Sequence, residues 1–368
     1  MAKSSRLVSL DIFRGMTVAF MILVNTPGSW DYVYAPLRHS KWHGCTPTDL
    51  VFPFFLFIVG VSVWFSMKKY GHELHTDSLL RILRRTISIF ALGLFLNIFP
   101  NFGRDYSALR IMGVLQRIAL AYFIGTIICI TVRRDYLWIV SAVILLLYWA
   151  LLAISGGDDP YSLENNLVLR IDKLILGENH LSTAFGIPFD PLGLLSTIPA
   201  AVNVMIGYYT AELLTKKSAS VKNILKILFI GAGLIGLGLL WGRIFPINKP
   251  LWTSSYVLYS SGLAMIILAF VYWVTDVLKF RGWGTPFLIF GTNALTSYFL
   301  AGIWAKALLL VKTGGEPDSA TLYSWFYEKV CVPVAGNLNG SLMFAIIQVI
   351  LVWVITLILY RRKILIRL

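Results

Sequence analysis

Long apolar runs recur along the whole sequence, and they restrict its fold more than any other feature. Ten of them stand at residues 12–27, 49–67, 81–99, 111–132, 136–155, 191–214, 222–242, 252–277, 286–311 and 341–360. A helix needs about 20 mostly apolar residues to cross the ~30 Å hydrocarbon layer of a bilayer. Backbone polar groups must be satisfied within such a segment, so each run is expected to be helical. The sequence therefore predicts an all-α, polytopic membrane protein with about ten transmembrane helices, in a single domain over residues 1–368.

The distribution of basic residues predicts the orientation in the membrane. If both termini lie in the cytoplasm, nineteen of the 32 Lys and Arg residues stand in inner segments, ten in outer segments and three within runs. Cytoplasmic loops of membrane proteins carry such an excess of basic residues. The net charge of +14 is therefore assigned to topology and anionic lipid rather than to nucleic acid. We expect a multi-pass protein of a bacterial inner membrane with both termini inside.

Two connections expected on the outer side, 156–190 and 312–340, are long, whereas the inner ones are short. Connections of this length are usually functional or disordered, which weakly favours a function on the outer side. Cys45 and Cys331 also fall outside, where an oxidising compartment would allow a disulfide between them. Two free thiols are the simpler interpretation, and Cys129 lies within a run.

Polar and ionisable side chains inside spans are costly and are therefore functional candidates. Asp11 and Arg14 open the first run three residues apart, on one face of a helix. They form either a structural ion pair or a cytoplasmic mouth for a phosphate-bearing ligand, which arginine suits. Their charges also argue against a cleavable signal peptide. Asn25 closes the same run before Thr-Pro-Gly, where it either ends the helix or takes part in a site.

The segment 38–57 gathers reactive side chains between the first two runs: His39, Trp42, His43 and Asp49. Histidine is the side chain whose unperturbed pKa lies near neutrality, so His39 is a candidate general base or nucleophile. Asp49 either orients that histidine or stabilises a helix N-terminus. The spacing of His39 and His43 would allow a metal pair on a helix, but no HExxH motif or cysteine cluster accompanies it, and we expect no metal.

Gln116 and Arg117 lie inside the fourth run. An arginine at that depth must pair, snorkel or face a cavity, and a partner such as Asp11 or Asp49 would make it structural. From the residues alone, a polar interior with a histidine-bearing outer loop fits a transporter and a membrane-spanning group-transfer enzyme about equally.

Five motifs decide between these two classes. They are LDIFRGMTVAFMILVN, RHSKWHGCTPTDLVFPFFLFIVG, GVLQRIALAYF, DPLGLLSTIPAAVNVMIGY and PINKPLWTSSYVLYSSGLA. Together they resemble the heparan-α-glucosaminide N-acetyltransferase family of transmembrane acyltransferases, in family order over residues 8–277, and the likeness is weaker beyond Phe299. The resemblance implies transfer of an acetyl group from cytoplasmic acetyl-CoA, as cosubstrate, to a glucosamine-type amine on the far side of the membrane. A sugar or metabolite transporter on a related scaffold is the alternative.

The resemblance also implies roles for particular residues. The essential family histidine in the loop before the DLVFP helix corresponds to His39, and the family asparagine at the end of the first span to Asn25. The family usually has Asn where this chain has His43. Animal members carry a large luminal domain before the first span, and little of it is present here. That difference concerns the glycan acceptor and leaves the expected reaction unchanged.

The remaining candidates complete a predicted site. Asn25 would donate to the oxyanion of the tetrahedral intermediate, with His39 and Asp49 as the other catalytic residues. The predicted contacts to acetyl-CoA are Arg14, Gln116, Arg117, Lys249, Ser255 and Tyr256. The predicted contacts to the amino-sugar acceptor are Trp42, His43, Trp252 and Asn293. Interfacial burial of the tryptophans and interhelical hydrogen bonding by the hydroxyls are the alternatives, and a homodimer is compatible with the sequence.

Overall fold

A computed structural model describes residues 7–100, 102, 106–215, 221–314 and 319–366, and in this part of the chain every regular element is a helix. The α-helices are α1 (Val8–Asn25), α2 (Pro47–Met67), α3 (Thr76–Ile98), α4 (Val114–Thr131), α5 (Leu137–Ser155), α6 (Leu167–Leu176), α7 (Thr197–Thr215), α8 (Val221–Trp241), α9 (Ser254–Tyr272), α10 (Thr285–Thr292), α11 (Ala294–Leu310), α12 (Leu322–Phe326) and α13 (Val332–Arg361). Short 3₁₀ or π turns are η1 (Ala35–Leu37), η2 (Lys68–Tyr70), η3 (Tyr106–Ala108), η4 (Arg134–Tyr136), η5 (Glu178–His180), η6 (Trp273–Val277), η7 (Gly282–Gly284) and η8 (Tyr327–Cys331).

The all-helical, polytopic prediction is confirmed. Seven helical segments of the described residues are long and apolar enough to cross a membrane, and α10 with α11 adds an eighth if this pair, bent by 73°, is one span. The helices α3 and α7 coincide with two further expected runs but are more polar. The first turns of α3 contain Arg81, Arg84 and Arg85, and α7 is buried along nearly its whole length. The count of ten spans stays a prediction.

The helix boundaries differ from the expected runs at three places. The first helix begins at Val8 rather than residue 12, because Asp11 and Arg14 pair with each other and fit inside it. The expected outer loop 156–190 contains the amphipathic helix α6. The last helix begins at Val332, well before residue 341, and Gly336 breaks its regular geometry with a φ of 71°.

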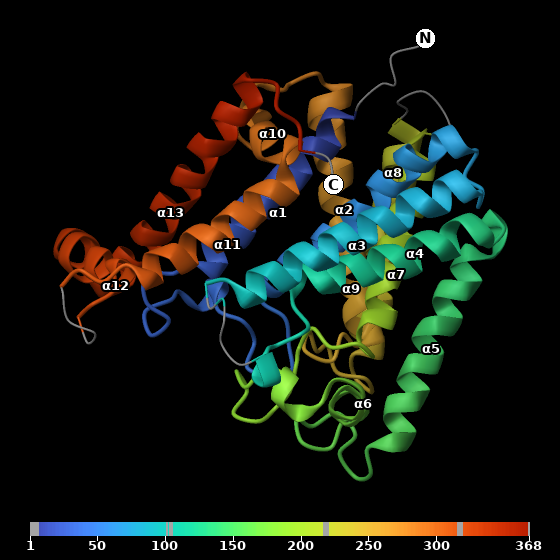
Figure 1. The fold of residues 1–368 in the computed structure, drawn as a ribbon. Coiled ribbons are helices and arrows are strands. Elements are labelled where there is room, and N and C mark those ends of the chain that lie inside the picture. Colours follow the sequence, from blue (N-terminus) through green and yellow to red (C-terminus); the bar gives the residue numbers. More distant parts are fainter. Residues whose placement is uncertain (1–6, 101, 103–105, 216–220, 315–318, 367–368) are drawn as a thin grey trace.

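The bundle is built around α1, α2, α7 and α9, in which α2 and α9 each contact the other three. The α3–α4 hairpin lies against α7 and α2 through α4, whereas α10, α11 and α13 lie against α1. Figure 1 shows the start of α1 and the α2–α3 connection at one end of the bundle, and α6 with the long loops around it at the other. The site described below lies at the loop-rich end.

Glycines let the central helices approach closely. A Cβ on Gly60 of α2 would lie 1.9 Å from the carbonyl oxygen of Val204, and one on Gly207 of α7 would lie 2.0 Å from that of Phe57. Gly15 of α1 and Gly291 of α10 make the same kind of contact with each other's helices. Small residues at such crossings let helix backbones touch in a membrane.

Candidate active site

A cavity of about 520 Å³ at the loop-rich end contains the sequence-predicted histidine, and we call it the His39 cavity. Its walls come from the end of α1, the 26–46 loop, the first turns of α2 and α4, the segment 182–192 and the 242–253 loop. The polar side chains that line it are Asn25, His39, Ser40, Thr48, Asp49, Arg110, Ser182 and Lys249. A space of this size and mixed lining is typical of a small-molecule site.

Three titratable groups meet in this cavity. Nδ1 of His39 lies 2.7 Å from Oδ1 of Asp49 and 3.1 Å from Nζ of Lys249, and that Nζ lies 3.4 Å from the same carboxylate oxygen. The carboxylate is 1% exposed, whereas the imidazole is 44% exposed. A buried carboxylate thus holds a histidine that remains open to solvent.

The local fold fixes the carboxylate of Asp49. It stands in the first turn of α2, where Thr46 caps the helix, and a helix N-terminus stabilises negative charge. Oδ2 of Asp49 accepts hydrogen bonds from the backbone N–H groups of Ser40 and Thr46, both at 3.0 Å. A hydrogen bond of 2.5 Å from the Tyr256 hydroxyl to the Asp49 carbonyl oxygen holds the same turn from behind.

The tautomer of His39 follows from these contacts. A charged Lys249 donates to Nδ1 only if that nitrogen carries no hydrogen, so the two contacts of Nδ1 require different tautomers. We assign the hydrogen to the shorter contact, with Asp49, on the basis of this network. Nε2 then keeps its lone pair and is the basic nitrogen, as in hydrolase triads. Burial lowers the pKa of Lys249, and the charge of Asp49 partly opposes this shift.

Asn25 lines the same cavity from the last turn of α1. Its side-chain Nδ2 donates one hydrogen bond, 2.8 Å long, to the carbonyl oxygen of Met21. An amide NH₂ has two hydrogens, so one remains available to a ligand. The structure therefore brings together His39, Asp49, Asn25 and Lys249, all predicted from the sequence.

A second cavity, of about 220 Å³, lies nearer the other end of the bundle, and we call it the Arg14 cavity. Arg14, Arg81 and Arg85 line it, together with Asn293 at the bend between α10 and α11. Arg14 is held by Asp11 at 3.0 Å and by the Ser62 hydroxyl at 2.7 Å. The predicted Asp11–Arg14 ion pair is thus confirmed, and its arginine also faces a cavity.

Arg85 lines the Arg14 cavity from α3. Its guanidinium lies over the ring of Tyr122, 4.7 Å from the centroid. Its Nε is buried and has no hydrogen-bond partner within the described residues. A permanently charged guanidinium in a cavity wall suits a phosphate or carboxylate ligand.

The same three helices form walls of both cavities. Helix α1 contributes Asn25 to one and Arg14 to the other, and α4 contributes Val114 and Tyr122. Helix α2 lines the His39 cavity down to Phe52, and its next inward turn lines the Arg14 cavity, a step of roughly 5 Å along the axis. The chain thus holds a histidine–aspartate pair and an arginine cluster in two separate cavities that share helices α1, α2 and α4 as walls.

Arg117 lies in neither cavity. It is fully buried and donates to the carbonyl oxygens of Pro191 and Gly193, both at 3.0 Å, and to the Ser196 hydroxyl. Its guanidinium also stacks on the ring of Trp252 at 4.9 Å. The prediction of Asp11 or Asp49 as its partner is therefore wrong, because two loop carbonyls and the Ser196 hydroxyl accept from its terminal nitrogens; its Nε has no partner among the described residues.

Nearby carboxylates reinforce that loop. Asp190 forms a two-point ion pair with Arg110, 2.8 Å at each nitrogen. Asp172 of α6 accepts from the N–H groups of Leu194 and Leu195, and burial raises its pKa to about 6. These contacts fix the segment that closes one side of the His39 cavity.

Several other predicted contacts also lie away from the two cavities. Trp252 is fully buried and donates to the Asn203 side chain, and Ser255 donates to the Phe245 carbonyl oxygen. Gln116 donates to the carbonyl oxygen of Ile111. Trp42 donates to the carbonyl oxygen of Tyr161 and packs against aromatic rings of the 156–190 loop.

His43 is exposed in the loop, and its Nδ1 contacts the Asn248 amide at 3.3 Å. Burial lowers its pKa, and the charge of Asp159 opposes this shift. Within the described residues, no group of three His, Cys, Asp or Glu side chains is placed to hold a metal ion. Cys45, Cys129 and Cys331 are free thiols, and burial raises the pKa of Cys45 to about 12.

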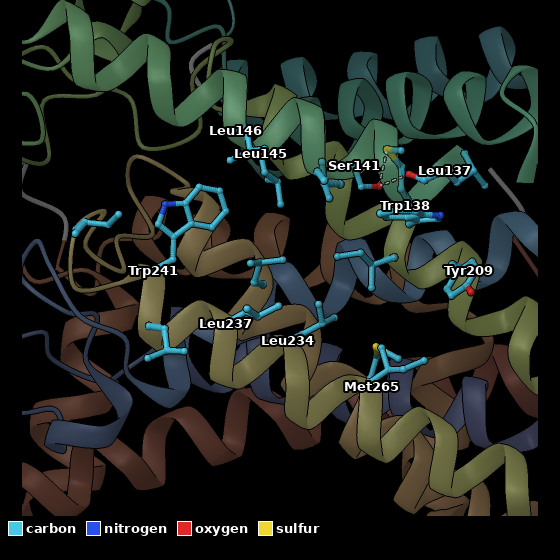
Figure 2. A pocket seen from close by; sticks show the side chains of 18 residues that line it. Leu137, Trp138, Ser141, Leu145, Leu146, Tyr209, Leu234, Leu237, Trp241 and Met265 are labelled. Carbon is cyan, nitrogen blue, oxygen red and sulfur yellow. Dashed lines mark hydrogen bonds between the residues drawn. The ribbon is translucent and has the colours of Figure 1, made fainter. Parts of the chain in front are cut away.

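A further cavity, apolar and larger than these two, lies between α5, α7, α8 and α9, with a volume of about 630 Å³. Figure 2 shows side chains such as Trp138, Leu234 and Trp241 lining it. Its only hydroxyls are those of Ser141 and Tyr209, and that of Ser141 donates to the carbonyl oxygen of Leu137 within α5. This crevice holds no acid–base pair and is not the reactive site.

Sequence reasoning missed Arg81, Arg85 and Arg110 as cavity residues. Arg81 and Arg85 were assigned to topology, because the positive-inside pattern explains basic residues near inner helix ends without any ligand. Arg110 was counted in an outer segment and given no role. A signal was present for two of them: Arg81 and Arg85 are four residues apart, so they share one face of α3. Trp30, which also lines the His39 cavity, carried no such signal.

Comparison with known proteins assigns the chain to a family. Residues 6–238 match the family described as "Heparan-alpha-glucosaminide N-acetyltransferase, catalytic". The human protein named heparan-alpha-glucosaminide N-acetyltransferase is 30% identical over 351 residues, which cover 80% of this chain and 52% of that relative. The mouse protein of the same name is 29% identical over 355 residues, with 81% and 53% covered.

The chain spans about half the length of these curated relatives. The family match covers well over half of this chain and contains Asn25, His39, Asp49 and the three arginines of the Arg14 cavity. The chain therefore belongs to the heparan-alpha-glucosaminide N-acetyltransferase catalytic family, a family of membrane acetyltransferases.

Proposed function

We propose that the protein is a transmembrane N-acetyltransferase that moves an acetyl group from cytoplasmic acetyl-CoA to the amine of a glucosamine-type sugar on the outer side of a bacterial inner membrane. One observation carries the proposal: a histidine–aspartate pair and a cluster of arginines lie in two cavities built on the same helices. An acyl transfer across a membrane needs both, with the base on the acceptor side and the cations on the donor side.

The donor would bind with its phosphates at the Arg14 cavity. Arg14, Arg81 and Arg85 offer charge-assisted hydrogen bonds, which are strong with phosphate oxygens. The thioester would then point along α2 toward the His39 cavity. In this arrangement Lys249, predicted earlier as a contact to acetyl-CoA, belongs to the acceptor side with His39.

The reaction would proceed by direct transfer with both substrates bound. Nε2 of His39 takes a proton from the sugar amine as the amine nitrogen bonds to the acetyl carbonyl carbon. The C–S bond then breaks, and the leaving thiolate takes the proton from Nε2 of His39, which restores the neutral imidazole. Asp49 keeps the imidazole in the productive tautomer, and Asn25 donates to the developing oxyanion. Transfer through an acetylated His39 is the alternative route.

The test compares the wild type with His39→Ala, using isotope-labelled acetyl-CoA, glucosamine-type acceptors and mass spectrometry of the product. Loss of a positioned acid–base group should lower turnover by roughly 100- to 10,000-fold and leave the affinity for acetyl-CoA unchanged. Lys41→Ala, an exposed change in the same loop, is the control for loop disturbance. Near-normal turnover by His39→Ala would contradict the catalytic assignment.

A rapid quench of the wild type with labelled acetyl-CoA alone separates the two routes. Stoichiometric label on His39 would show that the acetyl group passes through this histidine and would contradict direct transfer. A protein that neither binds nor hydrolyses acetyl-CoA would point instead to the transporter alternative.

A further inference from the structure

Of the tryptophans singled out by the sequence, Trp252 is buried and Trp42 is half-buried, and neither lines the His39 cavity, but another tryptophan does. Trp30, in the loop after α1, lines this cavity and is 63% exposed. Exposing an indole ring to water is unfavourable. An exposed aromatic side chain beside a catalytic histidine therefore suggests a partner that covers it when bound.

The backbone around Trp30 is fixed rather than loose. The N–H groups of Gly28 and Ser29 donate to the carbonyl and hydroxyl oxygens of Ser341 in α13, at 3.2 and 3.1 Å. The Ser341 hydroxyl returns a hydrogen bond of 3.1 Å to the Ser29 carbonyl oxygen. On the other flank, Arg38 donates to the carbonyl oxygen of Asp31 at 3.0 Å. The backbone that carries Trp30 is thus held in place, which lowers the entropic cost of binding a ligand there.

A second aromatic ring, Phe185 in the 156–190 loop, lines the same cavity. Its ring meets those of Trp42 and Phe189 edge to face, with centroids 5.7 and 5.4 Å away. Trp42 is itself anchored through its Nε1 to the Tyr161 carbonyl oxygen. Trp42 therefore supports the cavity wall from behind, and Phe185 forms the surface.

We propose that Trp30 and Phe185 form the subsite that binds the pyranose ring of the acceptor, against the polar side of the cavity at His39. This inference rests on the proposed function and names the residues that would select its acceptor. A hexosamine has faces of C–H groups and a polar edge, and aromatic faces carry negative charge density that attracts both C–H groups and an ammonium. The aromatic wall would orient the ring while the amine faces the imidazole.

The experiment measures steady-state kinetics of Trp30→Ala and Phe185→Ala with glucosamine as the varied acceptor. We expect Trp30→Ala to raise KM for the acceptor roughly tenfold, equivalent to about 1.4 kcal/mol, with the affinity for acetyl-CoA and the turnover at saturating acceptor close to wild type. Trp30→Phe should recover part of the loss. The control is Trp325→Ala, an exposed tryptophan of α12 that does not line the cavity.

An unchanged acceptor KM in active Trp30→Ala would overturn the subsite and leave the proposed function standing. If the substitution also lowered the thermal stability relative to wild type, and did so more in a bilayer than in detergent, Trp30 would be an interfacial anchor. If the wild-type protein transferred no acetyl group to any amino sugar, both the proposed function and the subsite would be wrong.

Discussion

At the scale of single residues, the chemistry depends on which nitrogen of His39 is held. Nδ1 contacts the buried Asp49 at 2.7 Å, and the same carboxylate belongs to the capping box at the start of α2. The first turn of α2 therefore positions the imidazole that we propose as the base. A change that disturbed this helix start would also misplace the imidazole, although the two residues are ten positions apart in the chain.

Two buried or half-buried arginines should respond differently to substitution. We expect Arg85→Ala to weaken acetyl-CoA binding by at least roughly tenfold, because a hydrogen bond to a charged group contributes ~1.5–3 kcal/mol. Arg117→Met should instead lower the thermal stability, since each buried carbonyl oxygen left unpaired costs about 1–3 kcal/mol. Calorimetric titration with acetyl-CoA and thermal unfolding in detergent measure the two effects. Weakened binding by a fully stable Arg117→Met would reverse the assignment.

Arg117 shows which contacts of a residue cannot be predicted from the sequence. Its depth in a span correctly required a partner, because an unpaired charge is costly there. The partners are carbonyl groups of residues 191 and 193, 74 and 76 positions away, and backbone atoms leave no signature in a sequence. His39, Asp49 and Asn25 were predictable because their motifs are long, and Asp49 also begins a helix.

At the scale of helices, the length of an apolar run predicts well that a helix forms there, but it predicts poorly where that helix is interrupted. Every expected run contains a helix, since a membrane leaves few alternatives for the backbone. The bend of 73° between α10 and α11 was not expected, because no proline marks Asn293. There the side-chain amide of Asn293 bonds to the carbonyl oxygen of Ile364 and accepts from Ile366 N–H. Broken helices of this kind often border ligand sites in membranes.

The crossing of α2 and α7 gives a prediction at this scale. Gly60→Ala would place a methyl group 1.9 Å from the Val204 carbonyl oxygen, so the helices must separate. Such overpacking typically costs about 1–3 kcal/mol, and it would also disturb the wall shared by the two cavities. The temperature of thermal unfolding and the rate of acetyl transfer should both fall. Gly233→Ala in α8 is the control, because a Cβ there meets nothing within 4 Å. Equal stability of the two variants would mean that the crossing tolerates separation.

At the scale of the whole molecule, the two cavities indicate how the chain crosses the bilayer. His39 and Arg110 line the same cavity, whereas Arg81, between them in sequence, lines the other. We therefore predict that the chain crosses along α2 and returns along α3, although α3 is polar for a span. The same reasoning predicts that α7 crosses, because Pro191 borders the His39 cavity and α7 leads away from it. Ten crossings, an even number, would leave both termini on one side.

Cysteine-accessibility labelling tests this topology as the last prediction. Leu74→Cys and Asn165→Cys replace exposed residues at opposite ends of the bundle. An impermeant thiol reagent applied to intact cells should label position 165 and spare position 74, and inverted vesicles should reverse this pattern, because the basic residues favour a cytoplasmic 67–81 connection. Background should be low, since Cys129 and Cys331 are buried and the pKa of Cys45 is raised to about 12, which leaves little reactive thiolate at neutral pH. If position 165 reacted only in inverted vesicles, the protein would have the opposite orientation in the membrane, and His39 would lie on the acetyl-CoA side.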